Sequence, residues 1–281
     1  MSFVLTLSCP DRPGIIRAVA GHLADAGCNV TDSQQFADRD TRRFFLRAEA
    51  DPPVGLDLDV LRGSFAGVGH HFAMDWQLHD AAERPRVLIL VSRAGHCLND
   101  LLFRWESGAL RADVVGVVSN HADLRAMAER HGVPFSHVPV PAGGKPAAEA
   151  ALLDLVEAEK VDLVVLARYM QILSPAVTAA LPGRVINIHH SFLPSFAGAR
   201  PYHQAYERGV KLIGATAHYV TADLDEGPII EQDVARVDHA ARPEQLVAAG
   251  QDVEALVLAR AVRWHVEHRV MINGVRTVVF R

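Results

Sequence analysis

Three residues, Asn187, His189 and Asp225, have side chains that could act together on a carbonyl group. Asn187 and His189 stand two residues apart in the apolar run 185–191, and residues two apart on a strand point to the same face. Asp225 lies in the segment 221–228, where Gly and Pro restrict the backbone. An amide donor, a titratable ring and a carboxylate suit addition to a carbonyl carbon. The alternative interpretation of the first two residues is a buried structural pair that satisfies its own hydrogen bonds.

The region from residue 86 onward must position these side chains, and it alternates short apolar runs with helix-like segments. Strands are predicted over 87–91, 114–118, 161–166, 185–188 and 213–220. Helices are predicted over 96–105, 124–131 and 243–268, followed by a short hairpin around Asn273 and Gly274. This alternation predicts an α/β domain with a mostly parallel, Rossmann-like sheet that binds ligands at the carboxyl ends of its strands. Charged residues of the final helix, such as Glu254, are expected on its solvated face.

The first 80 residues follow a different pattern. Strands are predicted over 3–8, 29–36, 43–50 and 72–78, and helices over 15–26 and 56–65. The order βαββαβ is that of a ferredoxin-like domain. The polar, proline-terminated segment 81–86 is the expected linker. The sequence therefore predicts two domains, 1–80 and 87–281.

Composition excludes several classes of protein. The chain has 281 residues, with 28 Lys and Arg against 33 Asp and Glu and a net charge of −5, so no nucleic-acid partner is expected. Its longest aliphatic runs are too short to span a membrane, and its first residues lack a basic leader. Three cysteines without a CxxC motif predict neither a disulfide framework nor a zinc site, and the 15 histidines form no helical metal-binding motif. These observations predict a soluble cytoplasmic protein without a metal.

Residues 185–228 resemble the catalytic core of the folate-dependent formyltransferases. The resemblance is carried by I-N-I-H-H-S-F-L-P and, further on, by H-Y-V-T-A-D-L-D-E-G-P. It implies that Asn187, His189 and Asp225 surround the formyl group of 10-formyltetrahydrofolate, with Thr216 and His218 in support. Folate is then the substrate, and no other cofactor is expected.

The same resemblance implies where the pterin ring binds. One wall of its site would be the segment after the strand 161–166, and the other would precede Asp225. The family usually has Arg where Gln171 stands, which leaves backbone contacts rather than a side-chain contact at that position. The implied pterin contacts are Met170, Gln171, Ile172, Leu173, Thr221, Ala222 and Asp223.

The N-terminal segment C-P-D-R-P-G-I-I-R is similar to that of ACT domains, small modules that commonly bind amino acids. The resemblance implies homo-oligomers that pair through this domain. An amino-acid carboxylate could bind the amides at the start of the helix 15–26, beside Asp11, Gly14 and Asn29. Glycine and methionine are candidate effectors, since both lie downstream of one-carbon folate chemistry. The alternative is a purely structural dimerisation module.

The loop after the first strand of the second domain bears on the choice between transfer and hydrolysis. Related transferases that formylate a phosphorylated amine carry a G-x-G-S-N loop there, whereas this chain has V-S-R-A-G-H-C-L-N with the single Gly95. The difference predicts hydrolysis to tetrahydrofolate and formate, which would supply formate for purine synthesis and balance the one-carbon folate pools. Asn187 and charged His189 would bind the oxyanion, while Asp225 favours the charged ring or acts on the water. Two alternatives remain, a transferase with an unidentified amine acceptor and an amino-acid sensor without activity.

Overall fold

The computed structural model describes residues 2–193 and 201–281, Pro201 by its backbone alone. The chain divides into two compact units. Unit 1 contains Met1–Arg84 together with Glu267–Met271 and Val278–Arg281, and unit 2 contains Pro85–Val266 with Ile272–Thr277. The predicted second domain, 87–281, is therefore wrong at its C-terminal end, because two of its segments belong to unit 1, where they pack beside Phe45 and Arg47. No helix in the described ranges has the length and apolar character of a membrane span.

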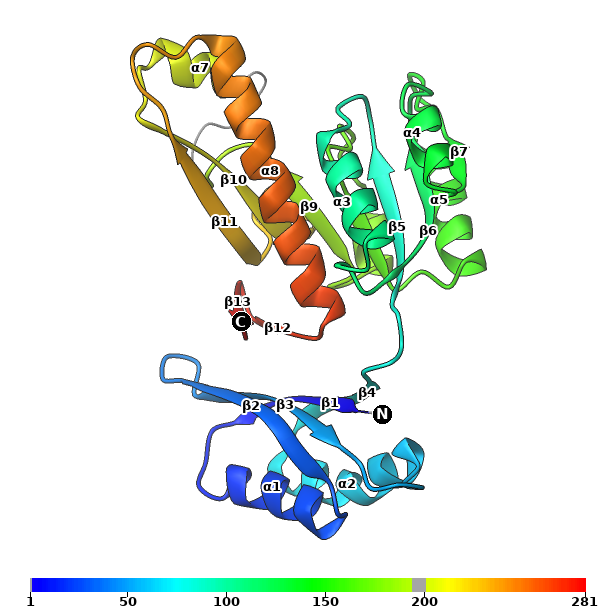
Figure 1. The fold of residues 1–281 in the computed structure, drawn as a ribbon, viewed down its shortest axis with the longest axis vertical. Helices are drawn as coiled ribbons and strands as arrows, with labels where there is room; N and C mark the ends of the chain where they lie inside the picture. The colour runs from blue at the N-terminus through cyan, green and yellow to red at the C-terminus, as the bar shows by residue number, and fades with distance from the viewer. Residues whose placement is uncertain (1, 194–200) are drawn as a thin grey trace. The chain divides into compact units, whose positions relative to one another are not determined.

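Unit 1 has the predicted βαββαβ order. Its strands are β1 (Phe3–Pro10), β2 (Asn29–Asp38), β3 (Arg43–Asp51) and β4 (Asp75–Asp80), and its helices are α1 (Ile15–Asp25) and α2 (Leu58–Phe72). The strands form an antiparallel sheet in the order β2-β3-β1-β4. Both helices cover one face of this sheet (Figure 1). Alternate residues of β1, namely Phe3, Leu5 and Leu7, point into the core between sheet and helices.

Helix α2 extends further than predicted, because its end is set by packing that the sequence pattern does not show. The expected helix ended at residue 65, but α2 continues to Phe72 and is capped by Ala73 with φ 50°. Gly69 makes room for the ring of Trp76, since a Cβ there would lie 2.3 Å from Nε1 of that indole. Glycine is therefore retained inside the helix for close packing despite its low helix propensity.

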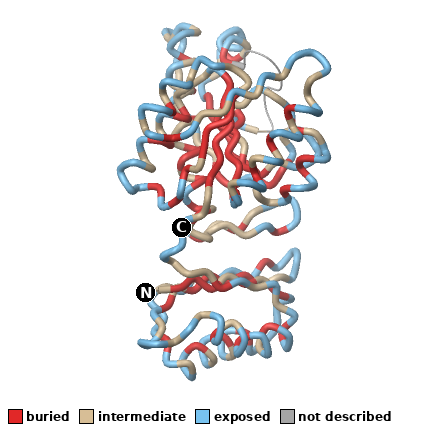
Figure 2. Tube along the Cα trace, turned by 90° about the vertical axis from the view of Figure 1, so that its right-hand side faces the viewer, coloured by how far each residue is buried: buried red, intermediate tan, exposed pale blue. Residues whose placement is uncertain are grey.

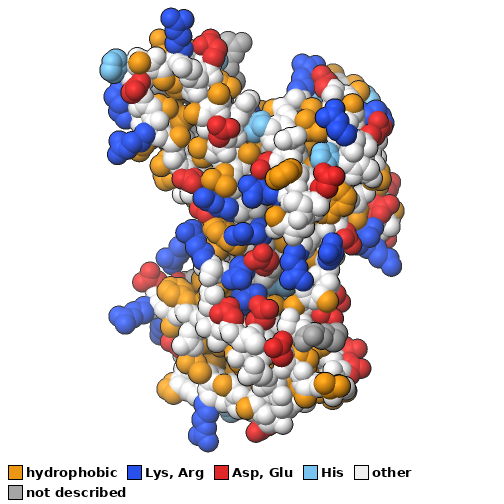
Figure 3. Space-filling model, in the orientation of Figure 1, with side chains coloured by type: hydrophobic (Ala, Val, Ile, Leu, Met, Phe, Trp, Pro, Cys, Tyr) orange, Lys and Arg blue, Asp and Glu red, His pale blue; other side chains and the backbone are white. Residues whose placement is uncertain are grey.

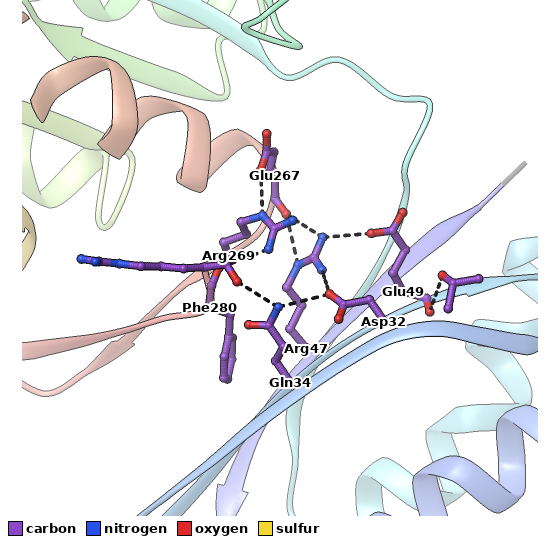
Figure 4. A network of polar contacts seen from close by, with 9 residues as sticks. Asp32, Gln34, Arg47, Glu49, Glu267, Arg269 and Phe280 are labelled. Carbon is purple, nitrogen blue, oxygen red and sulfur yellow. Dashed lines mark hydrogen bonds and ion pairs between the residues drawn. The ribbon is translucent and has the colours of Figure 1, made fainter. Parts of the chain in front are cut away.

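The other face of the unit 1 sheet is covered by the C-terminal segment. Phe45 of β3 forms a small core with Met271, Val278 and Phe280. Beside it, the buried guanidinium of Arg47 binds the backbone oxygen of Glu267 and forms ion pairs with the carboxylates of Asp32 and Glu49, 3.2 and 3.4 Å away (Figure 4). The amide of Gln34 donates to the backbone oxygen of Arg281 (3.1 Å).

Unit 2 contains the predicted mostly parallel sheet. Its strands lie in the order β11-β10-β9-β8-β5-β6-β7, and β10 runs antiparallel to both β9 and β11 while the other neighbours are parallel. The elements are β5 (Arg86–Val91), α3 (His96–Glu106), β6 (Asp113–Ser119), α4 (Arg125–Arg130), β7 (Phe135–His137), α5 (Lys145–Ala158), β8 (Leu163–Leu166), α6 (Pro175–Ala180), β9 (Val185–His189), α7 (Pro201–Glu207), β10 (Leu212–Tyr219), β11 (Ile229–Arg236) and α8 (Pro243–Val266). The hairpin at Asn273 is β12 (Val270–Asn273) and β13 (Arg276–Val279).

Helices cover both faces of this sheet, as the continuous apolar strands predicted. Leu88 and Leu90 of β5 pack with Leu152 and Val156 of α5, whereas α3 and α8 contact each other, and α8 also contacts β9, β10 and β11. Buried residues gather on the central strands of unit 2 (Figure 2). On the face shown in Figure 3, positive and negative side chains are interspersed over each unit, in keeping with the small net charge of −5.

Candidate active site

Pairing of β9 with β10 brings polar side chains together at one end of the sheet. Asn187 is opposite His218, and His189 is opposite Thr216. The amide nitrogen of Asn187 lies 3.2 Å from Nε2 of His218. Because His218 lies 2.9 Å through Nδ1 from the backbone oxygen of Tyr219, Nδ1 carries a hydrogen and Nε2 can accept from Asn187. The second amide hydrogen of Asn187 remains for another acceptor.

A constrained turn after β10 positions Asp225. Asp225 has φ 58°, a left-handed conformation that Asp adopts more readily than most residues. Two residues later, Gly227 passes so close to the end of β10 that a Cβ would lie 1.7 Å from the backbone oxygen of Tyr219. The amide of Tyr219 donates to the oxygen of Pro228 (3.0 Å), which closes the turn. The backbone therefore directs the Asp225 carboxylate at the neighbouring strands.

The Asp225 carboxylate contacts two histidines. Its Oδ1 lies 3.2 Å from Nδ1 of His189 and 3.7 Å from Nε2 of His218. The neighbouring rings of His189 and, second, His218 hold the pKa of Asp225 well below its usual value, although partial burial opposes them. Asp225 is therefore ionised at neutral pH. It also fixes which nitrogen of the His189 ring carries a hydrogen toward it.

The remaining ring nitrogen of His189 faces a cavity. Within the part of the chain that the structure describes, Nε2 of His189 is buried and has no hydrogen-bond partner, and His189 lines a cavity of about 680 Å³. Asn187, His218 and Asp225 line the same cavity. A buried polar atom without a partner is costly in a protein that binds nothing there. The arrangement is suited to hydrogen bonding with a ligand oxygen.

The residues expected to bind the pterin also line this cavity. Met170–Leu173 and Thr221–Asp223 are all among its lining residues. Met170 and Ile172 are exposed, with 60% of each residue accessible, whereas Leu173 is buried. Exposed large apolar side chains beside a cavity are typical of a ligand-binding wall.

Ser92, which is not among the predicted site residues, holds this wall in place. Its hydroxyl accepts from the amide of Met170 (3.0 Å) and donates to Oδ1 of Asn120 (2.6 Å). Its own amide donates to the oxygen of Arg168 (3.2 Å), a residue with φ 65°. A serine at the carboxyl end of a buried strand was the available signal, because such ends carry binding residues in parallel sheets.

Thr216 is placed behind the site rather than in it. It is fully buried and does not line the cavity. Its hydroxyl donates to the oxygen of Ser191 (3.0 Å) and accepts from the amide of Leu193 (3.1 Å). Thr216 therefore fixes the chain that leaves β9.

The expectation for Glu254 was wrong, because this residue is fully buried in α8 instead of solvated. It lines the cavity together with Arg168, His190 and Tyr202. Helical spacing could have revealed it, since Gly250 and Leu258, four residues to either side, are buried on the same face. The charge of Glu254 alone wrongly indicated a solvated position.

The three effector candidates belong to unit 1 and not to this cavity. Asp11, Gly14 and Asn29 are exposed. Gly14 has φ 99° and is the N-cap residue of α1. It provides no side-chain hydrogen bond to the first turn of this helix. The backbone amide of Asp11 is already bonded to the oxygen of Arg42 (2.9 Å).

Comparison with known proteins identifies two families. Residues 85–262 match the formyl transferase family, and residues 3–63 match the ACT domain. Formyltetrahydrofolate deformylase of Corynebacterium sp. (strain P-1) is 53% identical over 279 residues, which are 99% of this chain and 98% of that protein. The corresponding Bacillus subtilis protein is 49% identical, over 98% of this chain and 93% of the relative.

Solved structures agree with this result. The crystal structure of formyltetrahydrofolate deformylase from Burkholderia mallei is 56% identical, with a TM-score of 0.96 over 100% of this chain and 99% of that one. Glycinamide ribonucleotide transformylase 1 from Symbiobacterium toebii is 35% identical, with a TM-score of 0.68 over 72% of this chain and 97% of its own. The chain therefore belongs to the formyl transferase family and, within it, to the formyltetrahydrofolate deformylases.

Proposed function

We propose that this protein hydrolyses 10-formyltetrahydrofolate to tetrahydrofolate and formate. The contact between Asp225 and His189, which leaves Nε2 of the ring facing a cavity with an apolar wall, is the observation that carries the proposal. The relatives of matching length are named for this deformylation. The cavity volume of about 680 Å³ is in the range that holds small organic ligands.

The reaction begins when water adds to the formyl carbon on N10. The carbonyl oxygen becomes an oxyanion, which accepts hydrogen bonds from Nε2 of His189 and from the free amide hydrogen of Asn187. One donor of this kind contributes about 10²–10³ in rate. The Asp225 carboxylate, 3.2 Å from Nδ1, holds the ring with Nε2 directed into the cavity.

Asp225 then completes the transfer of the proton. Because the pKa of Asp225 is held low, its carboxylate is a weak base toward free water. It accepts the proton once the forming carbon–oxygen bond has made the attacking water acidic. The bond between carbon and N10 breaks as N10 gains this proton. Formate and tetrahydrofolate leave. His218 keeps Asp225 and Asn187 in place through its contacts with both.

Water is the favoured nucleophile because the chain lacks a built phosphate site for a second substrate at the start of α3. Gly95 precedes α3, and a Cβ there would meet side chains of Leu124 and Met127 at 3.0 and 3.1 Å. This glycine thus permits close packing. A glycine-rich loop that presents several amides to a phosphate would require a different sequence.

No metal or cofactor beyond the folate is needed for these steps. The hydrogen-bond donors and the carboxylate are supplied by Asn187, His189 and Asp225. The three cysteines are free and buried, which fits a reducing compartment, and we place the protein in the cytoplasm. There it would supply formate for purine synthesis and balance the pools of one-carbon folates.

For unit 1 we propose that a small amino acid binds near Gly14 and that the chain forms homo-oligomers through its ACT domain. The start of α1, which has no side-chain cap from Gly14, supports this proposal, since free amides there can bind a carboxylate. Glycine and methionine are the candidate ligands. Calorimetry with the full chain tests both, because the C-terminal residues belong to unit 1. Flat titrations would favour the structural dimerisation module.

An assay of formate release without any amine tests the hydrolase directly. The protein and 10-formyltetrahydrofolate are mixed, and formate and tetrahydrofolate are measured together. Equal amounts of the two products are expected. Turnover that begins only after an amine is added would instead indicate a transferase, and no turnover under either condition would favour a sensor.

A further inference from the structure

Four polar residues form a cluster at the cavity, which we call the Glu254 cluster: Tyr202 and Glu254, which are buried, and His96 and Arg168, which are partly exposed. Oε1 of Glu254 accepts from the hydroxyl of Tyr202 (2.5 Å). Oε2 of Glu254 lies 2.7 Å from Nε2 of His96 and 3.5 Å from Nε of Arg168. Each carboxylate oxygen is therefore occupied by a neighbour. Arg168, Tyr202 and Glu254 all line the cavity that contains His189 and Asp225.

The carboxylate of Glu254 is charged despite its complete burial. Burial raises its pKa, but the hydrogen bond from His96, the charge of Arg168 and the hydrogen bond from Tyr202 together hold the pKa below its usual value. Burial and the neighbouring Glu254 raise the pKa of Tyr202, so its hydroxyl keeps its hydrogen and donates it. A buried charge of this kind is stable only while its partners remain.

His96, Cys97 and Glu254 also place potential metal ligands within 4.8 Å of one another. Burial raises the pKa of the Cys97 thiol well above its usual value, so the sulfur keeps its proton. Glu254 already uses both oxygens. This chemistry favours a hydrogen-bonded cluster over a metal site.

Tyr202 reaches Glu254 because residue 250 is glycine. A Cβ on Gly250 would lie 2.2 Å from Cζ of Tyr202 and 2.3 Å from its hydroxyl oxygen. Gly250 and Glu254 are four residues apart on α8 and thus on the same face of the helix. The ring of Tyr202 occupies the space that the side chain of any residue other than glycine would fill at position 250. The glycine at position 250 therefore allows the Tyr202 hydroxyl to reach the Glu254 carboxylate.

The Glu254 cluster lies close to the proposed reacting groups. The ring of His190 forms an edge contact with that of His189, with centroids 5.1 Å apart. His190 also experiences the charges of Arg168, Glu254 and Asp225. Burial, aided by the charges of Arg168 and His189, lowers the pKa of His190 to about 4, so this ring is neutral at neutral pH.

An amine that competes with water for the formyl carbon needs an anionic partner. It enters a site largely as an ammonium ion, which must be bound and must lose a proton before it can attack. Among the described residues that line the cavity, the carboxylates are Asp223, Asp225 and Glu254. Asp223 is exposed, Asp225 is the proposed acceptor for the proton of the attacking water, and both oxygens of Glu254 are bonded within its own cluster.

We propose that Tyr202 is a specificity-determining residue. It excludes amine acceptors because its hydroxyl binds Oε1 of Glu254 and its ring fills the adjacent space. The proposal rests on the hydrolase function above and explains why water is used. Removal of the tyrosine should free Oε1 of Glu254 to hold an amine. Glu254 would take one proton from the ammonium group. The amine nitrogen would then bond to the formyl carbon as the bond to N10 breaks, and N10 would gain the second proton that the nitrogen loses. The products would be an N-formylamine and tetrahydrofolate.

The test measures formate and N-formylglycinamide in one reaction that contains 10-formyltetrahydrofolate and glycinamide. Tyr202→Ala is expected to raise the N-formyl product at least about tenfold over wild type. Gly250→Ala should have the same effect without a change at Tyr202, because its methyl group displaces the ring. Tyr202→Phe, which frees Oε1 but keeps the ring, should show a smaller increase. Tyr206→Ala is the matched control, since this exposed tyrosine lies on the same helix outside the cavity.

The outcomes separate this proposal from the proposed function. If Tyr202→Ala and Gly250→Ala still release formate but yield no more N-formylglycinamide than wild type, the role of Tyr202 is overturned and the hydrolase stands. If wild type releases no formate without amine, the proposed function itself is overturned. An equal increase in Tyr206→Ala would also refute a specific role for Tyr202.

Discussion

Oδ1 of Asp225 lies 3.2 Å from Nδ1 of His189, and this contact determines what the histidine can do. One ring nitrogen is committed to the carboxylate, so the other is the group that faces the cavity. The two residues come from different elements, since His189 ends β9 and Asp225 lies in the turn after β10. The carboxylate therefore fixes the orientation of the ring and leaves Nε2 to meet a ligand.

Replacement of Asp225 by Asn should slow hydrolysis by about 10²–10³, because the neutral amide cannot accept a proton from the attacking water. Side-chain size is retained, so the fold should persist. Steady-state formate release with a circular dichroism control measures the effect. Glu226→Gln removes an exposed carboxylate next to it in sequence and should leave turnover unchanged. Normal turnover in Asp225→Asn would contradict the assigned role.

Replacement of Gly227 by Ala should lower kcat although residue 227 does not line the cavity. The added Cβ would lie 1.7 Å from the oxygen of Tyr219, so the turn must shift and carry Asp225 with it. We expect a loss of about 10²-fold, since small misplacements of a reacting group have effects of this size. Gly67→Ala, on an open helix surface, is the control. An unchanged kcat would mean that the turn does not position Asp225.

The sequence was sufficient to predict which side chains of the candidate site lie together, where strand periodicity and turn chemistry specify their positions. Asn187 and His189 lie on one strand, so their shared face follows from their spacing, and Asp225 lies in a turn marked by Gly227 and Pro228. Glu254 and Tyr202 could not be paired in this way. Their contact depends on the long-range packing of α7 on α8 and on the missing Cβ of Gly250.

The fold was predictable to a similar extent. Long apolar runs specified the central strands, whereas short or polar elements such as β7 and β11 escaped detection. The partly exposed β11 pairs only at the sheet edge, so it needs no continuous apolar run. The return of the C-terminal segment to unit 1 depends on contacts of Phe45 and Arg47, and no local pattern encodes such contacts.

Replacement of Arg47 by Met should reduce the free energy of unfolding by about 1–3 kcal/mol, because the backbone oxygen of Glu267 and two carboxylates lose a buried donor. Asp32 and Glu49 are partly exposed, so water can replace part of the loss. Arg47→Lys should fall between wild type and Arg47→Met, since one ammonium cannot reach all three partners. Urea denaturation measures the difference. A midpoint equal to that of wild type would show that this network adds no stability.

Acidification should destabilise unit 1 through His79. This ring stacks on His268 with centroids 3.5 Å apart, and burial, helped by the charge of Arg62, lowers the pKa of His79 to about 4. The unfolded chain binds a proton near pH 6.5, so stability is full above that value and is lost as the pH falls toward 4.

Between pH 7.5 and 5.5 the expected loss from His79 is about 1 kcal/mol. His79→Gln should therefore lose less stability than wild type over this interval in denaturant titrations. His239→Gln, at an exposed position, should follow wild type. Parallel pH dependence in His79→Gln and wild type would contradict a depressed pKa at this site.

Single-turnover formate release by His189→Ala, in the absence of any amine, tests the central claim most directly. The wild-type protein should release formate and tetrahydrofolate in equal amounts. His189→Ala should be slower by at least about 10², while it binds a folate analogue as tightly as wild type does, because only the donor to the oxyanion is removed. Formate release at the wild-type rate from His189→Ala would contradict the account.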